Sequence, residues 1–175
     1  MTKNNFKKII FLDRDGVINK KADDHEYITN VEHFVFTDEI FNLLNKFKDK
    51  KYEFIIITNQ RGIARGKMTE DDLKKIHNNM INRFKENHIE ILDIFYCPHD
   101  VDSCDCRKPK PGLLNQATKK FKIDLNESIF FSDSMTDILM GQEYGINKNI
   151  FLKTDTLKKL KIISPKNQNL CTTKK

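Results

Sequence analysis

Short apolar runs alternate along this chain with stretches in which apolar residues recur every three or four positions. The runs have the length of β-strands, and the stretches between them have the period of amphipathic α-helices. Strands are predicted at residues 8–12, 54–58, 93–96, 128–132 and 149–152, and helices at 40–47, 73–84, 111–121 and 138–144. This alternation is typical of an α/β domain with a mainly parallel sheet.

Individual residues mark where several of these helices begin and end. Thr69 and Asp72 have the spacing of a capping box ahead of the second helix. Pro111 suits the first turn of the third helix, and Gly145 suits the end of the fourth. The apolar stripes of the helices are interpreted as core and nothing more.

Length and composition are those of one compact domain. No Pro-, Gly- or Ser-rich stretch divides the 175 residues, so we predict a domain at residues 1–163 and a loosely ordered polar tail at 164–175. The apolar runs are far too short to span a membrane, and the N-terminus lacks the apolar stretch of a secretory signal. We therefore expect a soluble, cytoplasmic monomer with no membrane partner. The formal charge of +6 favours an anionic partner only weakly, because much of it is Lys on helix faces and in the tail.

Two carboxylates stand where the first predicted strand ends. Asp13-Arg14-Asp15-Gly16-Val17 directly follows an apolar run, and residues i and i+2 of an extended chain project to the same side. Asp13 and Asp15 are therefore expected to face one substrate, as a nucleophile and an acid would. The alternative interpretation of these five residues is an ordinary turn after a strand.

Polar groups follow other predicted strands as well. Thr58, Asn59 and Gln60 follow the second strand, Arg107 and Lys108 come after the third, and Asp133 and Asp137 follow the fourth. Because ligands bind beyond the carboxyl ends of parallel strands, these groups are expected to meet in one site. Thr58 would hold phosphoryl oxygens, unless it is an ordinary strand-end residue, and Lys108 would neutralise charge on the nucleophile and transition state. The set predicts metal-assisted phosphoryl transfer.

The same carboxylates suit a magnesium ion. Magnesium prefers oxygen ligands and usually takes one or two protein carboxylates, which Asp13 and Asp133 supply, with the backbone oxygen of Asp15 as a further ligand. Asp137 would support the metal without binding it directly. The alternative for Asp137 is a helix N-terminal acid that the helix dipole stabilises.

Three cysteines and a histidine lie within ten residues. Cys97, His99, Cys104 and Cys106 form a Cys₃His set, which suits a tetrahedral zinc ion. Four protein ligands leave no open position, so we expect structural zinc that stiffens the loop leading to Lys108. The alternative is a group of redox-inactive buried cysteines beside a chance histidine.

Taken together, the motifs resemble those of the haloacid dehalogenase superfamily of phosphotransferases. The segment 13–17 resembles its first motif, Thr58 its second, Lys108 its third, and Asp133 with Asp137 its fourth, over roughly residues 8–152. The resemblance implies a three-layer α/β/α Rossmann-like fold without a large cap domain. It also implies that Asp13 is phosphorylated, that Asp15 acts as general acid and then base, and that magnesium binds the first and fourth motifs.

One branch of the superfamily is especially similar. The zinc loop and the segment 58–66 resemble the D-glycero-D-manno-heptose-1,7-bisphosphate phosphatases of bacterial surface-sugar synthesis, whose nearest relatives are the histidinol-phosphate phosphatases. The resemblance implies a small phosphorylated sugar as substrate, release of its 7-phosphate, and substrate contacts from Arg107 and residues 19–27. The full set of candidate contacts is Arg14, Asn19, Tyr27, Asn59, Gln60, Arg61, Arg107 and Ser134.

Two features depart from that branch. Its fourth motif has Gly-Asp-Lys or Gly-Asp-Arg, whereas this chain has Ser132-Asp133-Ser134, so a cation near the phosphate is missing. The segment 20–26 is longer and more charged than in the heptose enzymes, and it lies where the substrate is expected.

Three other functions remain compatible with the sequence: a histidinol-phosphate phosphatase, a polynucleotide 3′-phosphatase and an inactive zinc-bearing binding module. The basic charge fits a nucleic-acid end, but no face interleaves aromatic residues with Lys or Arg to stack bases. An inactive module is disfavoured because every expected catalytic position is occupied.

Overall fold

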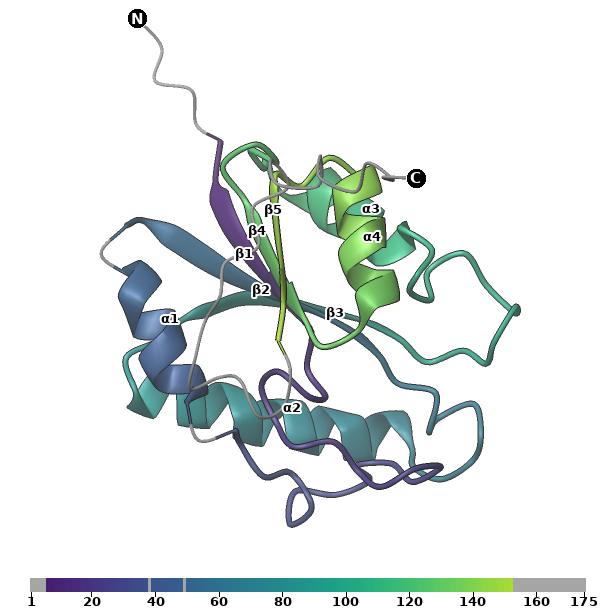
Figure 1. The fold of residues 1–175 in the computed structure, drawn as a ribbon. Coiled ribbons are helices and arrows are strands. Elements are labelled where there is room, and N and C mark those ends of the chain that lie inside the picture. The colour runs from purple at the N-terminus through teal and green to yellow at the C-terminus, as the bar shows by residue number, and fades with distance from the viewer. Residues whose placement is uncertain (1–5, 38, 49, 153–175) are drawn as a thin grey trace, which may run out of the picture.

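The computed structural model describes residues 6–37, 39–48 and 50–152, which form a parallel sheet between two pairs of helices (Figure 1). The elements are β1 (Lys8–Leu12), α1 (Ile40–Lys48), β2 (Tyr52–Asn59), α2 (Glu70–Glu86), β3 (Ile91–Cys97), α3 (Gly112–Lys120), β4 (Ile129–Ser132), α4 (Met135–Glu143) and β5 (Lys148–Phe151). The strand order is β3-β2-β1-β4-β5, and every pairing is parallel. The predicted α/β class and its three layers are confirmed, and no inserted domain interrupts the sheet in these ranges.

Alternation along the strands builds a separate core on each face of the sheet. Ile10 and Leu12 of β1 pack with residues of α1 and α2, whereas Ile9 and Phe11 pack with residues of α3 and α4. All four side chains are fully buried, as expected for a parallel strand that helices cover on both faces. In Figure 1, α1 and α2 accordingly lie on one side of the sheet, and α3 and α4 lie on the other.

Three predicted signals lie at helix ends in the structure, although α4 begins at Met135 and not at residue 138. Thr69 and Asp72 form a reciprocal capping box at the start of α2. Gly145 follows α4 with a φ of 97°, a left-handed conformation that glycine adopts without a Cβ clash. Pro111 is the residue just before α3. The strand β2 begins at Tyr52 rather than at residue 54, because its first residues already pair with β1.

The loop from β1 to α1 brings site residues over the carboxyl edge of the sheet. It packs against α2, where Val17, Ile18 and Phe34 join the core that contains Met80 and Phe84. Figure 1 shows this loop running along α2. The loop therefore has an apolar anchor of its own, which holds its polar residues in place.

Two predictions concern the rest of the chain and the membrane. The predicted boundary between residues 163 and 164, and the tail after it, lie outside the described residues. Within the part that the structure describes, no helix combines the length and the apolar character needed to cross a membrane.

Candidate active site

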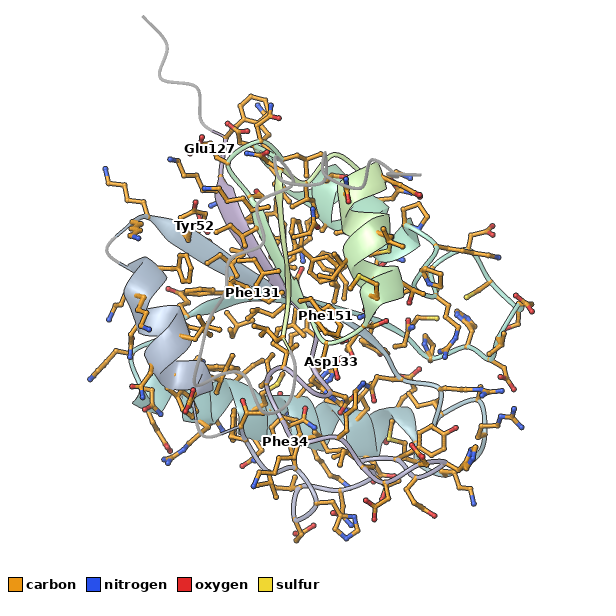
Figure 2. All side chains as sticks on the ribbon, in the orientation of Figure 1. Phe34, Tyr52, Glu127, Phe131, Asp133 and Phe151 are labelled. Carbon is orange, nitrogen blue, oxygen red and sulfur yellow. The ribbon has the colours of Figure 1, made fainter. Side chains whose placement is uncertain are left out.

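The predicted site residues gather at the carboxyl edge of the sheet. Asp13 and Asp15 follow β1, Thr58 lies at the end of β2, and Asp133 follows β4. Figure 2 shows Asp133 beyond the end of β4, with Glu127 at the opposite end of that strand. Parallel strands all end at this edge, so the topology brings together residues that are far apart in the chain.

A buried cluster of charges joins Asp13, Lys108 and Asp137. The Nζ atom of Lys108 lies 2.9 Å from Oδ1 of Asp13 and 2.6 Å from Oδ2 of Asp137. Burial raises the pKa of Asp13 to about 6, the charge of Asp137 adds to the rise, and Lys108 opposes it. Burial alone would lower the pKa of Lys108, but the two carboxylates outweigh it and raise that pKa. A permanent cation therefore faces the predicted nucleophile.

Asn59 fixes the backbone of the residue that carries this cation. Its Nδ2 atom donates to the carbonyl of Lys108 at 3.0 Å, and its Oδ1 atom accepts from the backbone N–H of Lys108 at 3.0 Å. Because Asn59 ends β2, this pair of hydrogen bonds ties the loop after β3 to the sheet. The sequence identified Asn59 as a substrate contact, and its tie to Lys108 is a second function that the structure adds.

Asp15 is held by donors on both oxygens. Its Oδ1 atom accepts from Arg14 at 2.9 and 3.2 Å and from Asn19 at 2.9 Å, and its Oδ2 atom accepts from Gln60 at 3.0 Å. Burial alone would raise the pKa of Asp15, but the charge of Arg14 and these hydrogen bonds lower it. The Oδ2 atom therefore has fewer protein donors than Oδ1.

Arg14 and His77 are buried near Asp15. Arg14 is 1 % exposed, and its guanidinium carbon lies 5.8 Å from the ring centroid of Phe34. Burial, with the Arg14 charge, lowers the pKa of His77 to about 3, so the imidazole is neutral and does not repel the guanidinium. The sequence did not single out His77, because it lies among the core residues of α2.

Asp133 faces the turn after β1. Gly16 has a φ of 90°, and any Cβ at this position would clash with the Asp133 carboxylate, so glycine permits the close approach. The Oδ2 atom of Asp133 is 2.6 Å from Nζ of Lys21. Its Oδ1 atom is buried and has no hydrogen-bond partner among the described residues. The sequence placed residues 19–27 at the substrate pocket but did not single out Lys21 as a partner of Asp133.

These carboxylates have the character of a cation site. A buried oxygen without a donor, as on Asp133, is costly unless a ligand satisfies it. Burial raises the pKa of Asp13, so a further cation beside it would stabilise its charged form. Hard oxygen ligands of this kind suit a small divalent cation. Asp137 instead accepts from the Ser132 hydroxyl at 3.1 Å and pairs with Lys108, so any support it gives to a metal stays a prediction.

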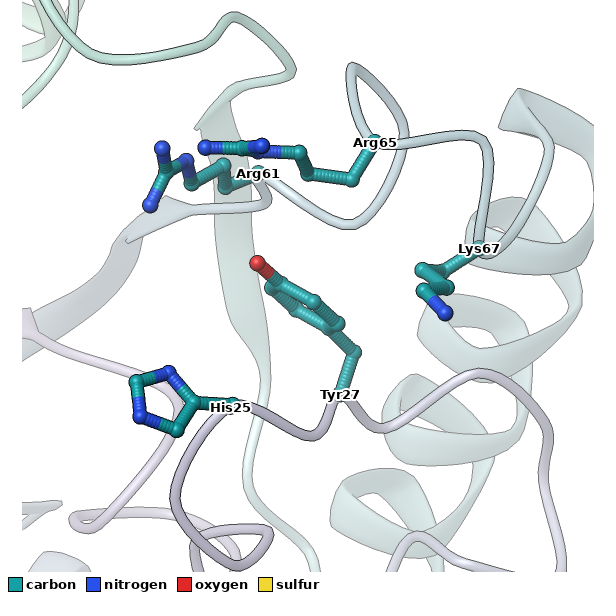
Figure 3. Close-up of a pocket in the computed structure, with 5 residues that line it drawn as sticks. All are labelled: His25, Tyr27, Arg61, Arg65 and Lys67. Carbon is teal, nitrogen blue, oxygen red and sulfur yellow. The ribbon is translucent and has the colours of Figure 1, made fainter.

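Two cavities adjoin at this edge. The smaller, about 180 Å³, is lined by Arg14, Asp15, Lys21, Ala22, Glu26, Tyr27, Ile28, Asn59 and Gln60. The larger, about 360 Å³, is lined by His25, Tyr27, Arg61, Arg65 and Lys67. Tyr27 belongs to both walls, and Figure 3 shows its hydroxyl directed toward the guanidinium groups of Arg61 and Arg65. Asp100 pairs with both arginines, at 2.5 and 3.1 Å.

Thr58, Arg107 and Ser134 are three further residues that the sequence predicts to contact the substrate. Thr58 is buried, and its hydroxyl accepts from Gln60 Nε2 at 2.9 Å. The Nη1 atom of Arg107 is buried without a hydrogen-bond partner among the described residues. The Ser134 hydroxyl lies 2.8 Å from that of Thr136, and Ser134 lines neither cavity. Their contacts with a substrate stay predictions.

The loop after β3 gathers four metal-binding side chains. The ligand atoms of Cys97, His99, Cys104 and Cys106 all lie within 4.8 Å of one another. The Sγ atoms of Cys97 and Cys104 are 3.5 Å apart, and His99 Nδ1 is 3.3 Å from Cys106 Sγ. Sulfur atoms around a tetrahedral ion with bonds of about 2.3 Å stand about 3.7 Å apart. The cluster therefore has nearly the size that suits a metal ion.

The parallel sheet, the paired carboxylates after β1 and the buried lysine define the haloacid dehalogenase class of phosphatases. The family model described as polynucleotide kinase 3 phosphatase matches residues 8–163. D-glycero-alpha-D-manno-heptose-1,7-bisphosphate 7-phosphatase of Photorhabdus laumondii subsp. laumondii is 43 % identical in an alignment 155 residues long, which covers 84 % of this chain and 83 % of the relative.

The corresponding beta-anomer enzyme of Pasteurella multocida is 38 % identical, over 85 % of this chain and 83 % of the relative. The crystal structure of D,D-heptose 1,7-bisphosphate phosphatase from B. bronchiseptica, complexed with magnesium and phosphate, matches with a TM-score of 0.75 and 28 % identity, over 82 % of this chain and 79 % of that one. The chain belongs to this heptose-bisphosphate phosphatase family within the haloacid dehalogenase superfamily. The predicted family and the predicted class of enzyme, a phosphoric monoester hydrolase, are confirmed.

Proposed function

We propose that the enzyme removes the 7-phosphate from D-glycero-D-manno-heptose 1,7-bisphosphate, a reaction of bacterial surface-sugar synthesis. The observation that carries this proposal is the cation-lined cavity beside the carboxylate site. A substrate with two phosphates needs a reacting site and a second anion site, and Tyr27 is part of the wall of both cavities. The names of the relatives support the same substrate.

The second phosphate is assigned to the larger cavity. Arg61, Arg65 and Lys67 line it, and Asp100 neutralises only part of their charge. Guanidinium groups bind phosphate through two parallel hydrogen bonds, which fixes orientation as well as affinity. The Tyr27 hydroxyl points to the same place and offers one more donor (Figure 3).

The reaction begins with attack by an Asp13 carboxylate oxygen on phosphorus, which breaks the bond from phosphorus to the sugar oxygen. Asp15 gives its proton to that oxygen as the sugar leaves. A water molecule then attacks the aspartyl-phosphate, Asp15 takes a proton from the water, and Asp13 is regenerated with release of phosphate. The phosphate dianion itself raises the pKa of Asp15 as it binds, because like charges disfavour ionisation, and this effect favours the protonated form that the first step needs.

Two further groups stabilise charge in the transition state. Lys108 lies 2.9 Å from Asp13 Oδ1, close enough to neutralise both the nucleophile and the phosphoryl group. Thr58 lies at the end of the adjacent strand and offers its hydroxyl to a phosphoryl oxygen. Magnesium would be held by Asp13, Asp133 and the backbone oxygen of Asp15, and when bound it offsets the negative charge of the phosphate.

A substrate panel tests the proposal. Phosphate release would be measured from both anomers of the heptose bisphosphate, from histidinol phosphate and from a 3′-phosphorylated oligonucleotide, with magnesium present or chelated. We expect a kcat/KM at least about 100-fold higher for one heptose bisphosphate anomer than for the other classes, since its second phosphate meets the cations that line the larger cavity. Preference for histidinol phosphate or the oligonucleotide would refute the assignment, and no release from any compound would indicate an inactive module.

We also propose that the Cys₃His cluster binds zinc, which stiffens the loop that leads to Lys108. Cys104→Ser removes one ligand, and we expect it to lose zinc and to lower kcat by roughly tenfold or more, because Lys108 is then held less firmly at Asp13. Zinc content would be measured by atomic absorption alongside kcat. Cys171→Ser is the matched control, since Cys171 is the cysteine outside the cluster. Full activity in a zinc-free Cys104→Ser enzyme would contradict this arrangement.

The monomeric state and the cytoplasmic location stay predictions from the sequence. Gel filtration with light scattering would test the monomer.

A further inference from the structure

Lys21 is a charged residue at the site that the reaction steps above do not use. It lies in the loop after β1, and its Nζ atom is 2.6 Å from Oδ2 of Asp133. Its side chain is 55 % exposed, whereas that of Asp133 is 7 % exposed, so a cation from the surface reaches over a nearly buried carboxylate. The same side chain is part of the wall of the smaller cavity, together with Asp15 and Gln60.

The ion pair occupies an oxygen that a divalent cation needs. Of the two oxygens of Asp133, Oδ1 is buried without a partner among the described residues, and Oδ2 is engaged by Lys21. A carboxylate this buried is strongly destabilised without a compensating charge. The ammonium group of Lys21 supplies that charge in the metal-free protein, in the place where magnesium would supply it.

We propose that Lys21 is a mobile cation, which neutralises Asp133 in the metal-free enzyme and moves to the phosphate when magnesium binds. Water competes for a half-exposed lysine, so the ion pair is weak and a divalent ion displaces it. The stem of lysine is long and flexible, so the released ammonium group stays at the cavity wall near Asp15. This inference rests on the magnesium and phosphate site of the proposed function.

The charges of the smaller cavity favour this second position. Arg14 and Lys21 are the cations among the described residues of its wall, and Arg14 is already paired with Asp15. When magnesium binds Asp133, the ammonium group of Lys21 loses its carboxylate partner. A phosphate dianion entering the cavity is then the strongest acceptor within reach, although Glu26 of the same wall is a competing carboxylate.

Two binding measurements test the proposal, and neither requires turnover or a sugar. Isothermal titration would give the affinity for magnesium alone, and then the affinity for inorganic phosphate at saturating magnesium. Lys21→Met removes the ammonium group and keeps an unbranched stem, and Lys21→Arg keeps the charge. Lys20→Met is the matched control, because Lys20 is the exposed neighbour in the same loop and lines neither cavity. Circular dichroism would verify the fold, and Lys21→Gln would replace Lys21→Met if that variant did not fold.

We expect Lys21→Met to bind magnesium about fivefold more tightly, because the competing cation is gone. The same variant is expected to bind phosphate about tenfold more weakly, because a charged donor is lost. Lys21→Arg and Lys20→Met should resemble the unmodified protein in both titrations. These opposite changes separate a mobile cation from a merely structural residue, whose loss would weaken both affinities.

Either of two results would overturn the proposal. Unchanged or weaker magnesium binding in Lys21→Met would show that Lys21 does not compete for Asp133. Unchanged phosphate binding would show that the released ammonium group turns elsewhere, for example to Glu26. Because both probes are inorganic, a failure of the heptose substrate in the panel would leave these results interpretable.

Discussion

The Asp13→Asn variant is expected to lose phosphate release by roughly 10³-fold or more while keeping its fold and its zinc content. An amide has no carboxylate oxygen to attack phosphorus, so the first covalent step fails. The shape of the side chain is unchanged, and its oxygen still accepts from the backbone N–H of Arg14, which lies 2.7 Å from Asp13 Oδ1. Lys108 also keeps its contact with Asp137.

A continuous phosphate-release assay, circular dichroism and metal analysis would check this expectation. Asp71→Asn is the matched control, because Asp71 is an exposed acid in the first turn of α2. The attachment point itself is visible in a crystal soaked with fluoroberyllate. The mimic should be bonded to an oxygen of Asp13, and a bond to Asp15 or Asp133 would reassign the nucleophile.

The fold was predictable because its signals are local. A parallel strand covered on both faces needs an uninterrupted apolar run, such as Ile9 to Leu12, and each helix needs one apolar stripe. The capping box of Thr69 and Asp72 and the left-handed Gly145 are equally local. Strand ends differed by a residue or two where pairing with a neighbouring strand, and not local composition, sets the boundary.

The site was predictable only in part, because some of its contacts join loops that share no sequence pattern. Asp13, Asp15 and Asp133 directly follow strands, and parallel topology alone brings such residues together. The contact of Lys21 with Asp133 depends instead on the path of the whole loop after β1. His77 was missed because a buried helix position has the same pattern whether it packs in the core or lies near Asp15.

The structure also bears on the departure in the fourth motif. The family pattern has a lysine or arginine directly after the aspartate. The residue after Asp133 in this chain is Ser134, whose hydroxyl forms a hydrogen bond with that of Thr136. Lys21 brings a cation to the same aspartate from another loop. The charged segment 20–26 and the neutral Ser134, which look unrelated in the sequence, are therefore connected through Asp133.

For Lys108→Met we expect kcat to fall by roughly 10²- to 10³-fold, with a smaller change in KM. The ammonium group faces Asp13 and is aimed at the charge that develops in the transition state. It also opposes the effect of burial on Asp13, whose pKa is raised to about 6. Removing the Lys108 ammonium group raises the pKa of Asp13 further. On acidification, the variant should therefore lose its activity at a higher pH than the unmodified enzyme does. Lys119→Met, at an exposed position on α3, is the control.

A second variant separates this chemical effect from a loss of stability. Lys108→Met alone leaves the buried carboxylates of Asp13 and Asp137 unpaired, and breaking a buried ion pair in this way costs about 3 kcal/mol or more of folding free energy. Adding Asp137→Asn removes one of the two buried carboxylate charges that Lys108→Met leaves unpaired. Urea unfolding should therefore show that the double variant recovers most of the lost free energy of unfolding. Turnover should stay low, because no cation faces the phosphoryl group in the double variant. If turnover recovered together with stability, Lys108 would only hold the site together, and stabilisation of the transition state would have to come from the metal and Thr58 instead.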